Sequence, residues 1–135
     1  MILQLNNPLL IGKILELARI IPDIPVDVLE KMLLLGISDK DSAIYIFKKD
    51  DEIIGIIFAS KETWMGKKTC FIQVCAIKPV PKEKFIGFEL LMKIRLWAKE
   101  KGLKDMIFVC KRNYKPFTRK YKFALDGFIL KRSVL

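Results

Sequence analysis

The segment from Cys75 to Gly87 (CAIKPVPKEKFIG) carries residue types that can bind a phosphate group. An apolar run typical of a strand leads into a turn rich in proline and lysine, and an amphipathic run typical of a helix follows. Such a turn presents backbone N–H groups, and the N-terminus of the helix adds partial positive charge. Gly87 also lets the backbone come close to a ligand. The segment therefore predicts a phosphate cradle.

Residue by residue, this segment resembles the acetyl-CoA-binding signature of the GNAT superfamily of N-acetyltransferases. In that family an apolar strand end is followed by proline, then by R/Q-x-x-G-x-G/A, and then by a helix. Here Ile77 takes the last strand position and Pro79 the proline, with no gap in the alignment. Lys82 stands at the R/Q position, Phe85 at the first glycine and Gly87 at the second.

The resemblance implies that the chain binds acetyl-CoA. In the family, main-chain groups at the strand end pair with pantetheine as if it were an added strand, and they orient the thioester carbonyl. The turn then holds the pyrophosphate, and here Glu83 adds a negative charge that two neighbouring lysines partly offset. The positions carried over are Cys75, Ala76, Ile77, Lys82, Glu83, Lys84, Phe85, Ile86, Gly87, Phe88 and Asn113.

Residues 113–128 (NYKPFTRKYKFALDGF) resemble the closing pattern of the family, N-x-x-A-x-x-x-Y followed by a Gly-Phe turn. Asn113 matches the asparagine, and Phe117 and Tyr121 keep the four-residue spacing between alanine and tyrosine. One extra residue precedes Phe117, and two more precede the Gly-Phe pair. In the family this tyrosine can protonate the departing CoA thiolate, and a phenol with a pKa of about 10 suits that task. Tyr121 is therefore the predicted acid, with Tyr114 as the alternative.

The base that takes the amine proton must be a group other than histidine, because the chain contains none. Glu62 is the predicted catalytic carboxylate, with Asp51 and Glu52 as alternatives at ends of the predicted hairpin, and Gln73 lies mid-strand. Ordinary surface or strand polarity is the other interpretation of these residues. Enzymes of this family often work without a strong base, since orientation of the amine supplies much of the rate. The aromatic residues that could line the acceptor groove are Trp64 and Tyr45.

Hydrophobic periodicity predicts the elements that position these residues. The second helix is expected to close at Gly36, the turn before the long strand to hold Trp64, Met65 and Gly66, and the strand at 106–110 to be central and buried. In chain order the predicted elements are helices at 8–20 and 27–36, strands at 43–47, 53–60 and 69–77, a helix from about 86 to its cap at Gly102, a strand at 106–110, a helix at 116–123 and a strand at 128–135. This order (α-α-β-β-β-α-β-α-β) predicts an α/β fold, and it is also the order of the GNAT fold, with a mixed, splayed β-sheet and helices on both faces.

Length and composition limit the class of protein. A chain of 135 residues with 52% hydrophobic and 30% charged residues predicts one globular domain, residues 1–135. The apolar region from Pro8 to Ile21 is interrupted by charges and lacks the layout of a signal peptide, so we expect a cytoplasmic protein without a membrane span. Three cysteines and no histidine predict buried cysteines, no metal site and no Cys–His catalysis.

The distribution of charge leaves a second interpretation open. Residues 1–67 contain 8 basic and 10 acidic residues, whereas residues 68–135 contain 17 basic and 5 acidic ones. A polyanionic partner is implied, and either CoA or a nucleic acid would satisfy it. The alternative is therefore a catalytically inactive GNAT-fold binding module, and a small structural or regulatory protein is a third possibility. The basic residues that could hold the ribose phosphate of CoA or a nucleic acid are Lys111, Arg112, Lys115, Arg119, Lys120 and Lys122.

The leading hypothesis is an acetyl-CoA-dependent N-acetyltransferase acting on an amine. The acceptor, a small molecule or a peptide, is open at this point, and so is the oligomeric state. The acidic residues of the N-terminal half could build a groove for a basic peptide or polyamine.

Overall fold

The computed structural model describes residues 1–20, 24–79, 85–109, 119, 123, 132 and 133. Apart from four single positions, the helix predicted at 116–123 and the strand predicted at 128–135 lie outside the described residues. In chain order the described elements are β1 (Ile2–Gln4), the 3-10 segment η1 (Pro8–Leu10), α1 (Ile11–Leu15), the 3-10 segment η2 (Glu16–Ile20), α2 (Val26–Ser38), β2 (Ser42–Lys49), β3 (Glu52–Trp64), β4 (Lys67–Ile77), α3 (Ile86–Glu100) and β5 (Met106–Phe108).

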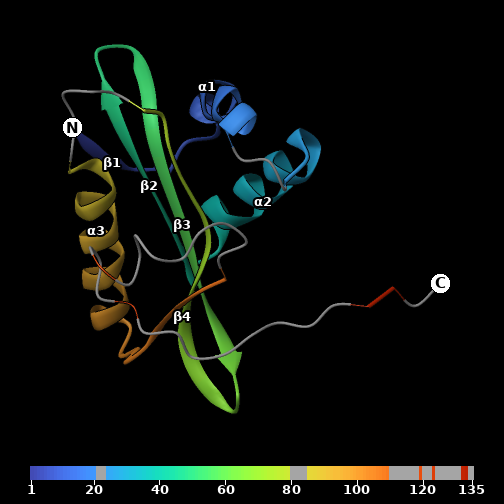
Figure 1. The fold of residues 1–135 in the computed structure, drawn as a ribbon, viewed down its shortest axis with the longest axis vertical. Coiled ribbons are helices and arrows are strands. Elements are labelled where there is room, and N and C mark those ends of the chain that lie inside the picture. Colours follow the sequence, from blue (N-terminus) through green and yellow to red (C-terminus); the bar gives the residue numbers. More distant parts are fainter. Residues whose placement is uncertain (21–23, 80–84, 110–118, 120–122, 124–131, 134–135) are drawn as a thin grey trace.

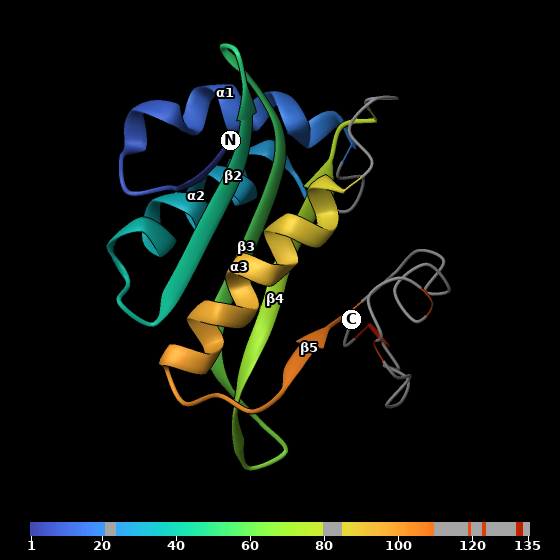
Figure 2. The same cartoon turned by 90° about the vertical axis from the view of Figure 1, so that its left-hand side faces the viewer.

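The described strands form one mixed sheet in the order β1-β2-β3-β4-β5, of which Figure 1 labels β1 to β4 and Figure 2 labels β5. Strands β1 to β4 are antiparallel neighbours, and β5 runs parallel to β4. Helices α1 and α2 pack on one face of the sheet and α3 packs on the other (Figures 1 and 2). The predicted α/β class, a mixed sheet with helices on both faces, is confirmed.

The N-terminal helical segment begins where the sequence predicts. The Asn7 side chain accepts a hydrogen bond from the Leu9 backbone N–H at 2.9 Å, and Pro8 takes the first helical position. The segment is helical throughout, but α1 is short and lies between two 3-10 segments. Strand β1, which pairs with β2 through three residues, was not predicted because so short a run shows no clear alternation.

The prediction that Gly36 closes the second helix is wrong, because α2 continues to Ser38. Gly36 is buried against the sheet, and a Cβ atom at this position would lie 2.2 Å from the Phe58 ring carbon Cε2. The glycine therefore permits a close approach of helix and strand. In sequence that role looks the same as a helix end.

The hairpins use two-residue turns with left-handed backbone. Asp50 has φ of 54° in the β2–β3 turn, and Met65 and Gly66 have φ of 51° and 80° in the β3–β4 turn. In the β3–β4 turn, two successive positive φ values match the twist of the flanking strands. Trp64 is the last residue of β3 and not part of the turn, so that boundary was wrong by one residue.

The long strand predicted at 69–77 forms most of β4. The prediction that the strand at 106–110 is buried was wrong. The three residues of β5 are half-buried rather than buried. Among the described strands β5 lies at the end of the order, beside β4, and its predicted central position stays a prediction because the strand predicted at 128–135 is outside the described residues. An apolar composition indicates contact with a core, but it does not give the position of a strand in the sheet.

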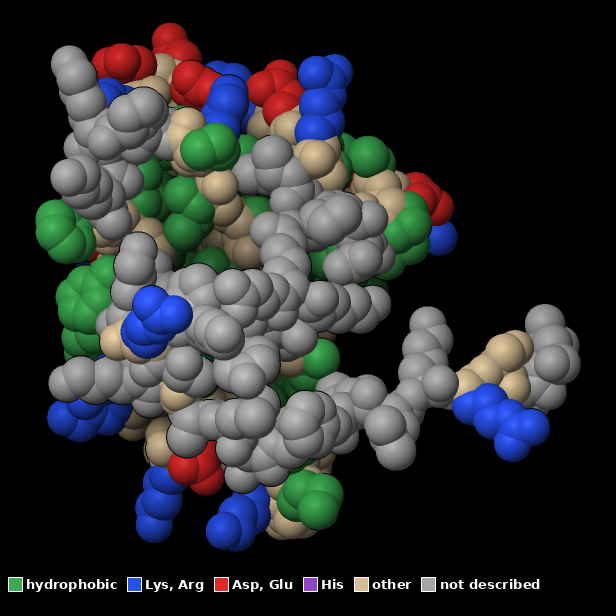
Figure 3. Space-filling view, viewed as in Figure 1, with side chains coloured by type: hydrophobic (Ala, Val, Ile, Leu, Met, Phe, Trp, Pro, Cys, Tyr) green, Lys and Arg blue, Asp and Glu red, His purple; other side chains and the backbone are tan. Residues whose placement is uncertain are grey.

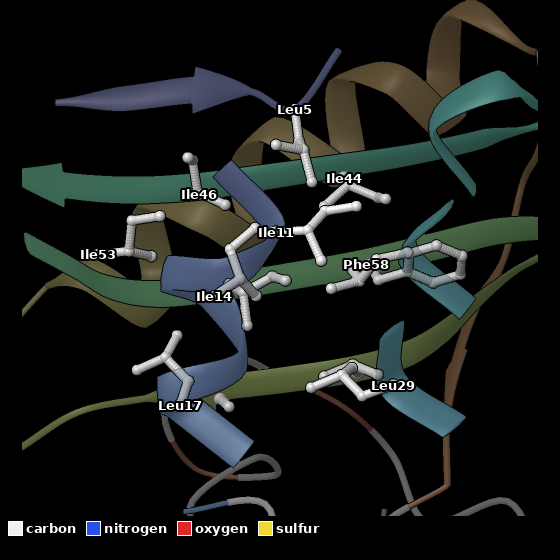
Figure 4. Packing of buried hydrophobic residues seen from close by; sticks show 13 residues of the cluster. Leu5, Ile11, Ile14, Leu17, Leu29, Ile44, Ile46, Ile53 and Phe58 are labelled. Atoms are coloured by element: carbon white, nitrogen blue, oxygen red, sulfur yellow. The ribbon is translucent and has the colours of Figure 1, made fainter. Parts of the chain in front are cut away.

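Two hydrophobic clusters hold the layers together. On one face Ile14 and Leu29 pack on Ile44, Ile46 and other strand residues, as Figure 4 shows. On the other face the buried residues of α3 pack on β2, β3 and β4. Full burial of one such side chain stabilises a fold by about 1.5–3 kcal/mol. In this second cluster, the residues of the sheet and of α3 that are at most 1% exposed are Ile57, Ala59, Cys70, Leu90 and Ile94.

In the part of the chain that the structure describes, no helix is long and apolar enough to cross a membrane.

Acidic and basic side chains lie side by side along the upper rim of the face in Figure 3. The charges of that rim are therefore mixed and do not form a patch of one sign.

Candidate active site

The centre of the site is a β-bulge in β4. Phe58 of β3 pairs with Val74, but the next residue, Ala59, pairs with Ile72, so Gln73 is an extra residue in β4. The bulge changes which side chains face which helices. Ile72 packs in the cluster with α3, whereas Val74, two positions on, packs in the cluster with α1 and α2.

Among the residues that the structure describes, the pairing of β5 with β4 ends at the same place. The last parallel pair is Ile72 with Phe108, and β4 continues for five residues beyond it, to Ile77. Figure 2 shows β5 leaning away from β4. The predicted pantetheine-binding positions Cys75, Ala76 and Ile77 lie on this last part of β4.

The start of α3 lies beside the end of β4. Gly55 pairs with Ile77, and a Cβ atom at Gly55 would lie 3.1 Å from both Ile86 Cγ2 and Leu90 Cδ1. The glycine therefore lets the first turn of α3 approach the sheet closely. The positive end of the helix is thus placed at the carboxyl end of the long strand.

Phe85, at the position of the family's first glycine, has a backbone conformation that does not require glycine. It precedes α3 with φ of −114°, a conformation open to any residue, and its side chain is 70% exposed. Its carbonyl oxygen accepts the first helical hydrogen bond from the Glu89 N–H at 2.9 Å. The N–H groups of Ile86, Gly87 and Phe88 precede that bond and have no partner within the helix. They are the donors that an anion could use.

The candidate bases lie at opposite ends of β3. Glu52 begins the strand and Glu62 lies ten residues on, about 33 Å away along an extended chain. Glu52 forms an exposed ion pair with Lys78, and the Asp51 carbonyl oxygen accepts a hydrogen bond from Lys13 Nζ. Glu62 is thus separated from Asp51 and Glu52.

A chain of hydrogen bonds joins Glu62 to the bulge. Gln73 Nε2 donates to Ser60 Oγ at 2.9 Å, and Ser60 Oγ donates to Glu62 Oε1 at 2.9 Å. Ser60 is buried, with 6% of its surface exposed, whereas Glu62 is exposed. Sequence reasoning missed Ser60. The available signal was polar residues at alternate positions, 60 and 62, at the end of an otherwise apolar strand.

The two aromatic candidates lie on different faces of the sheet. The Trp64 ring lies 6.0 Å from the ring of Phe71, and Trp64 shares the strand face of Ser60 and Glu62. Tyr45 packs in the cluster with α3, where burial and then the nearby Glu100 carboxylate raise its pKa. The structure brings Trp64 and Glu62 together and places Tyr45 away from them.

The family comparison can be set against this geometry. Residues 14–122 match the model of the acetyltransferase (GNAT) family. The chain belongs to the GNAT family. The predicted family and the predicted class of enzyme, an N-acetyltransferase, are confirmed.

Solved structures share the fold of this GNAT protein. An aminoglycoside 6'-N-acetyltransferase, AAC(6')-IG from Acinetobacter haemolyticus, matches with a TM-score of 0.84 and 13% identity over 98% of this chain and 97% of its own. AAC(6')-Iy, in complex with a bisubstrate analogue of CoA, matches with 0.81 and 16% over 100% and 98%. A predicted acetyltransferase from Clostridium acetobutylicum, with acetyl-CoA, matches with 0.79 and 15% over 99% and 97%. A comparison with curated protein sequences found no match.

Several predicted site residues of this GNAT protein lie outside the described part of the chain. They include the acid candidates, part of the phosphate turn and most of the basic cluster, of which only Arg119 is described. Their roles stay predictions, as does a cytoplasmic location. The undescribed candidates are Lys82, Glu83, Lys84, Asn113, Tyr114, Tyr121, Lys111, Arg112, Lys115, Lys120 and Lys122.

Proposed function

We propose that this GNAT protein transfers the acetyl group of acetyl-CoA to an amine of a small molecule or peptide, with residues 1–135 acting as one acyltransferase domain. The observation that carries the proposal is that the described pairing of β4 with β5 ends before Gln73, while β4 continues to Ile77, beside the start of α3. Main-chain groups of a strand that loses its neighbour can pair with an extended ligand. The donors at the helix start lie where that ligand's phosphates would end.

The residues present fit acetyl-CoA as the acyl donor. Cys75, Ala76 and Ile77 supply main-chain groups for the pantetheine arm, and the first N–H groups of α3 supply donors for the pyrophosphate. Phe85 is compatible with this arrangement, because its negative φ does not require glycine and its side chain is exposed to solvent. The ligands named for two of the solved structures above are a bisubstrate analogue of CoA and acetyl-CoA, which supports this choice.

The reaction requires one bond to form and one to break. The neutral amine nitrogen of the acceptor attacks the thioester carbonyl carbon, forming a C–N bond while the C–S bond breaks. Glu62 accepts the proton that the amine loses, and Tyr121 donates a proton to the departing thiolate. Backbone N–H groups beside the bulge stabilise the negative charge that develops on the carbonyl oxygen. The products are an N-acetylated acceptor and CoA.

Calorimetric titration with acetyl-CoA tests the proposal, with CoA and a short DNA duplex run in parallel at moderate salt. We expect acetyl-CoA to bind with a micromolar dissociation constant. Gly87→Leu is expected to weaken binding by about tenfold or more, since a side chain there would obstruct the helix start. Gly12→Leu is the control for adding a leucine to an exposed helical glycine, because no atom lies within 4 Å of a Cβ at Gly12.

The same titrations distinguish the alternative function. If neither CoA nor acetyl-CoA binds and the duplex binds in a salt-dependent way, the protein is a basic binding module and not an enzyme. A Phe85→Gly variant adds a second check. Because φ at Phe85 does not require glycine, restoring the family's residue should leave acetyl-CoA affinity within about threefold of wild type.

A further inference from the structure

The hydrogen bonds around Ser60 determine how the Gln73 amide is oriented. An ionised Glu62 carboxylate only accepts hydrogen bonds, so it takes the single hydroxyl hydrogen of Ser60. The Ser60 oxygen can then only accept, and Gln73 must present its Nε2 group to it. The carbonyl oxygen of the Gln73 amide, Oε1, is therefore turned to another direction.

Gln73 Oε1 lies at the boundary between the two parts of β4. Gln73 is the inserted residue of the bulge, next to the last pair between β4 and β5. Its side chain is half-buried, and among the described residues Oε1 has no hydrogen-bond partner. A polar acceptor thus lies where the long strand parts from its neighbour. Under the proposed function, the thioester lies along this strand.

The surroundings indicate what kind of molecule this acceptor oxygen receives. Glu62 lies on the same face of β3 as Ser60, where it is exposed to solvent and carries a negative charge. Trp64, two residues further along β3, packs at a tilt against Phe71 of β4 and adds apolar surface beside it. A negative charge next to aromatic rings favours a cationic amine on an apolar body and disfavours a carboxylate.

We propose that Gln73 is a positioning residue for the acceptor amine, oriented through Ser60 by Glu62. Its Oε1 atom accepts a hydrogen bond from the amine, and the charge of Glu62 selects amines that have no carboxylate beside the nitrogen. This inference rests on the proposed function and adds a substrate class to it. Gln73 itself transfers no proton, because a carboxamide is not a base at neutral pH.

Tryptamine and L-tryptophan form a matched pair of probes. They share the indole ring and the primary amine, and they differ in the carboxylate beside the amine. Their dissociation constants are measured by calorimetry on protein saturated with CoA, and acetyl-CoA is then used to measure kcat and KM. We expect millimolar or tighter binding of tryptamine and about tenfold weaker binding of L-tryptophan.

Variants of the chain separate the individual contributions. Gln73→Met keeps the size of the side chain but removes the acceptor oxygen, so tryptamine should bind about tenfold more weakly while the affinity for CoA is unchanged. Glu62→Gln should narrow the difference between the two probes. Ser60→Ala should weaken tryptamine binding several-fold, and Ser60→Thr, which keeps the hydroxyl, should restore it. Thr63→Val, on the opposite face of β3, is the control and should change neither probe.

The outcomes distinguish failure of the proposed function from failure of the inference about Gln73. A wild-type protein that fails to bind CoA overturns the proposed function, and this inference with it. Normal CoA binding with equal affinity for the two probes overturns the inference alone. The inference is also overturned if tryptamine does not bind at millimolar concentrations, or if Gln73→Met leaves tryptamine affinity unchanged.

Discussion

The two halves of β4 differ in what lies beside them. Residues 67–72 pair with β3, residues 70–72 also pair with β5, and Thr69, Cys70 and Ile72 are at most 3% exposed. Residues 73–77 pair with β3, extend beyond the last pair with β5, and end beside the first turn of α3. One inserted residue, Gln73, marks the boundary. A continuous strand thus provides packing in one half and a candidate binding edge in the other.

Deleting Gln73 would merge the two halves, and it has the largest expected effect. Removing one residue restores simple alternation and turns Val74 and Ala76 from the α1 and α2 face to the α3 face. We expect the free energy of unfolding to fall by about 3 kcal/mol or more, and acetyl-CoA binding to be lost. Urea denaturation and calorimetry measure both quantities.

Gln73→Ala is the control for this deletion, because it removes the side chain and keeps the residue count. It should retain the bulge and acetyl-CoA binding. If the deletion variant binds acetyl-CoA like wild type, the bulge does not form the binding edge.

Gly36→Ala tests the packing behind the bulge. The new methyl group would lie 2.2 Å from the ring of Phe58, the residue that pairs with Val74. We expect a loss of about 1–3 kcal/mol in unfolding free energy. Gly12→Ala, with open space around its Cβ, should instead stabilise α1 by about 0.4–1 kcal/mol. Phe58→Leu in the Gly36→Ala background should recover part of the loss, and no recovery would place the strain elsewhere.

The pH dependence of stability tests the packed half of the strand. Burial raises the pKa of the Cys70 thiol from 9.0 to about 12. The unfolded chain then ionises this thiol above about pH 9 while the folded chain does not, so stability is lost as pH rises from 9 towards 12. Between about pH 8 and pH 10.5 the wild type should lose about 1–2 kcal/mol more than Cys70→Ala. Parallel curves for the two proteins in urea denaturation would contradict the assignment.

The ion pair at the far end of β4 should have the smallest effect. Glu52 and Lys78 are 55% and 51% exposed, so water and salt screen their attraction. Glu52→Gln is expected to change the free energy of unfolding by about 0.5 kcal/mol or less at physiological salt. A loss above about 1 kcal/mol would show that this end of the strand is held more firmly than its exposure indicates.

Much of the local structure was predictable because it depends on neighbouring residues. Asn7 and Pro8 mark a helix start through a hydrogen bond two residues away, and the periodicity of α3 gives its buried face directly. The run before Pro79 gives the long strand, and the spacing from Ile77 to Gly87 gives the family. Each of these signals is contained in a short window of sequence.

Other features depend on contacts between distant segments. In the sequence Gly36 predicts a helix end, and only the contact with the Phe58 ring shows that it lets α2 approach β3 closely. The sequence predicts the same role, lining the acceptor groove, for Tyr45 and Trp64, but the strand register places them on opposite faces of the sheet. The character of β5 likewise depends on which strands lie beside it, and composition does not record that.

The sequence by itself determined the family and most of the described elements, and it predicts the positions that would contact the acyl donor. Tertiary structure decided where β4 changes face and which carboxylate is linked to that point. In a strand with apolar residues on both faces, a one-residue slip leaves no trace in the hydrophobic pattern. The link from Gln73 to Ser60 joins residues thirteen positions apart, and it exists only because the hairpin register brings them together.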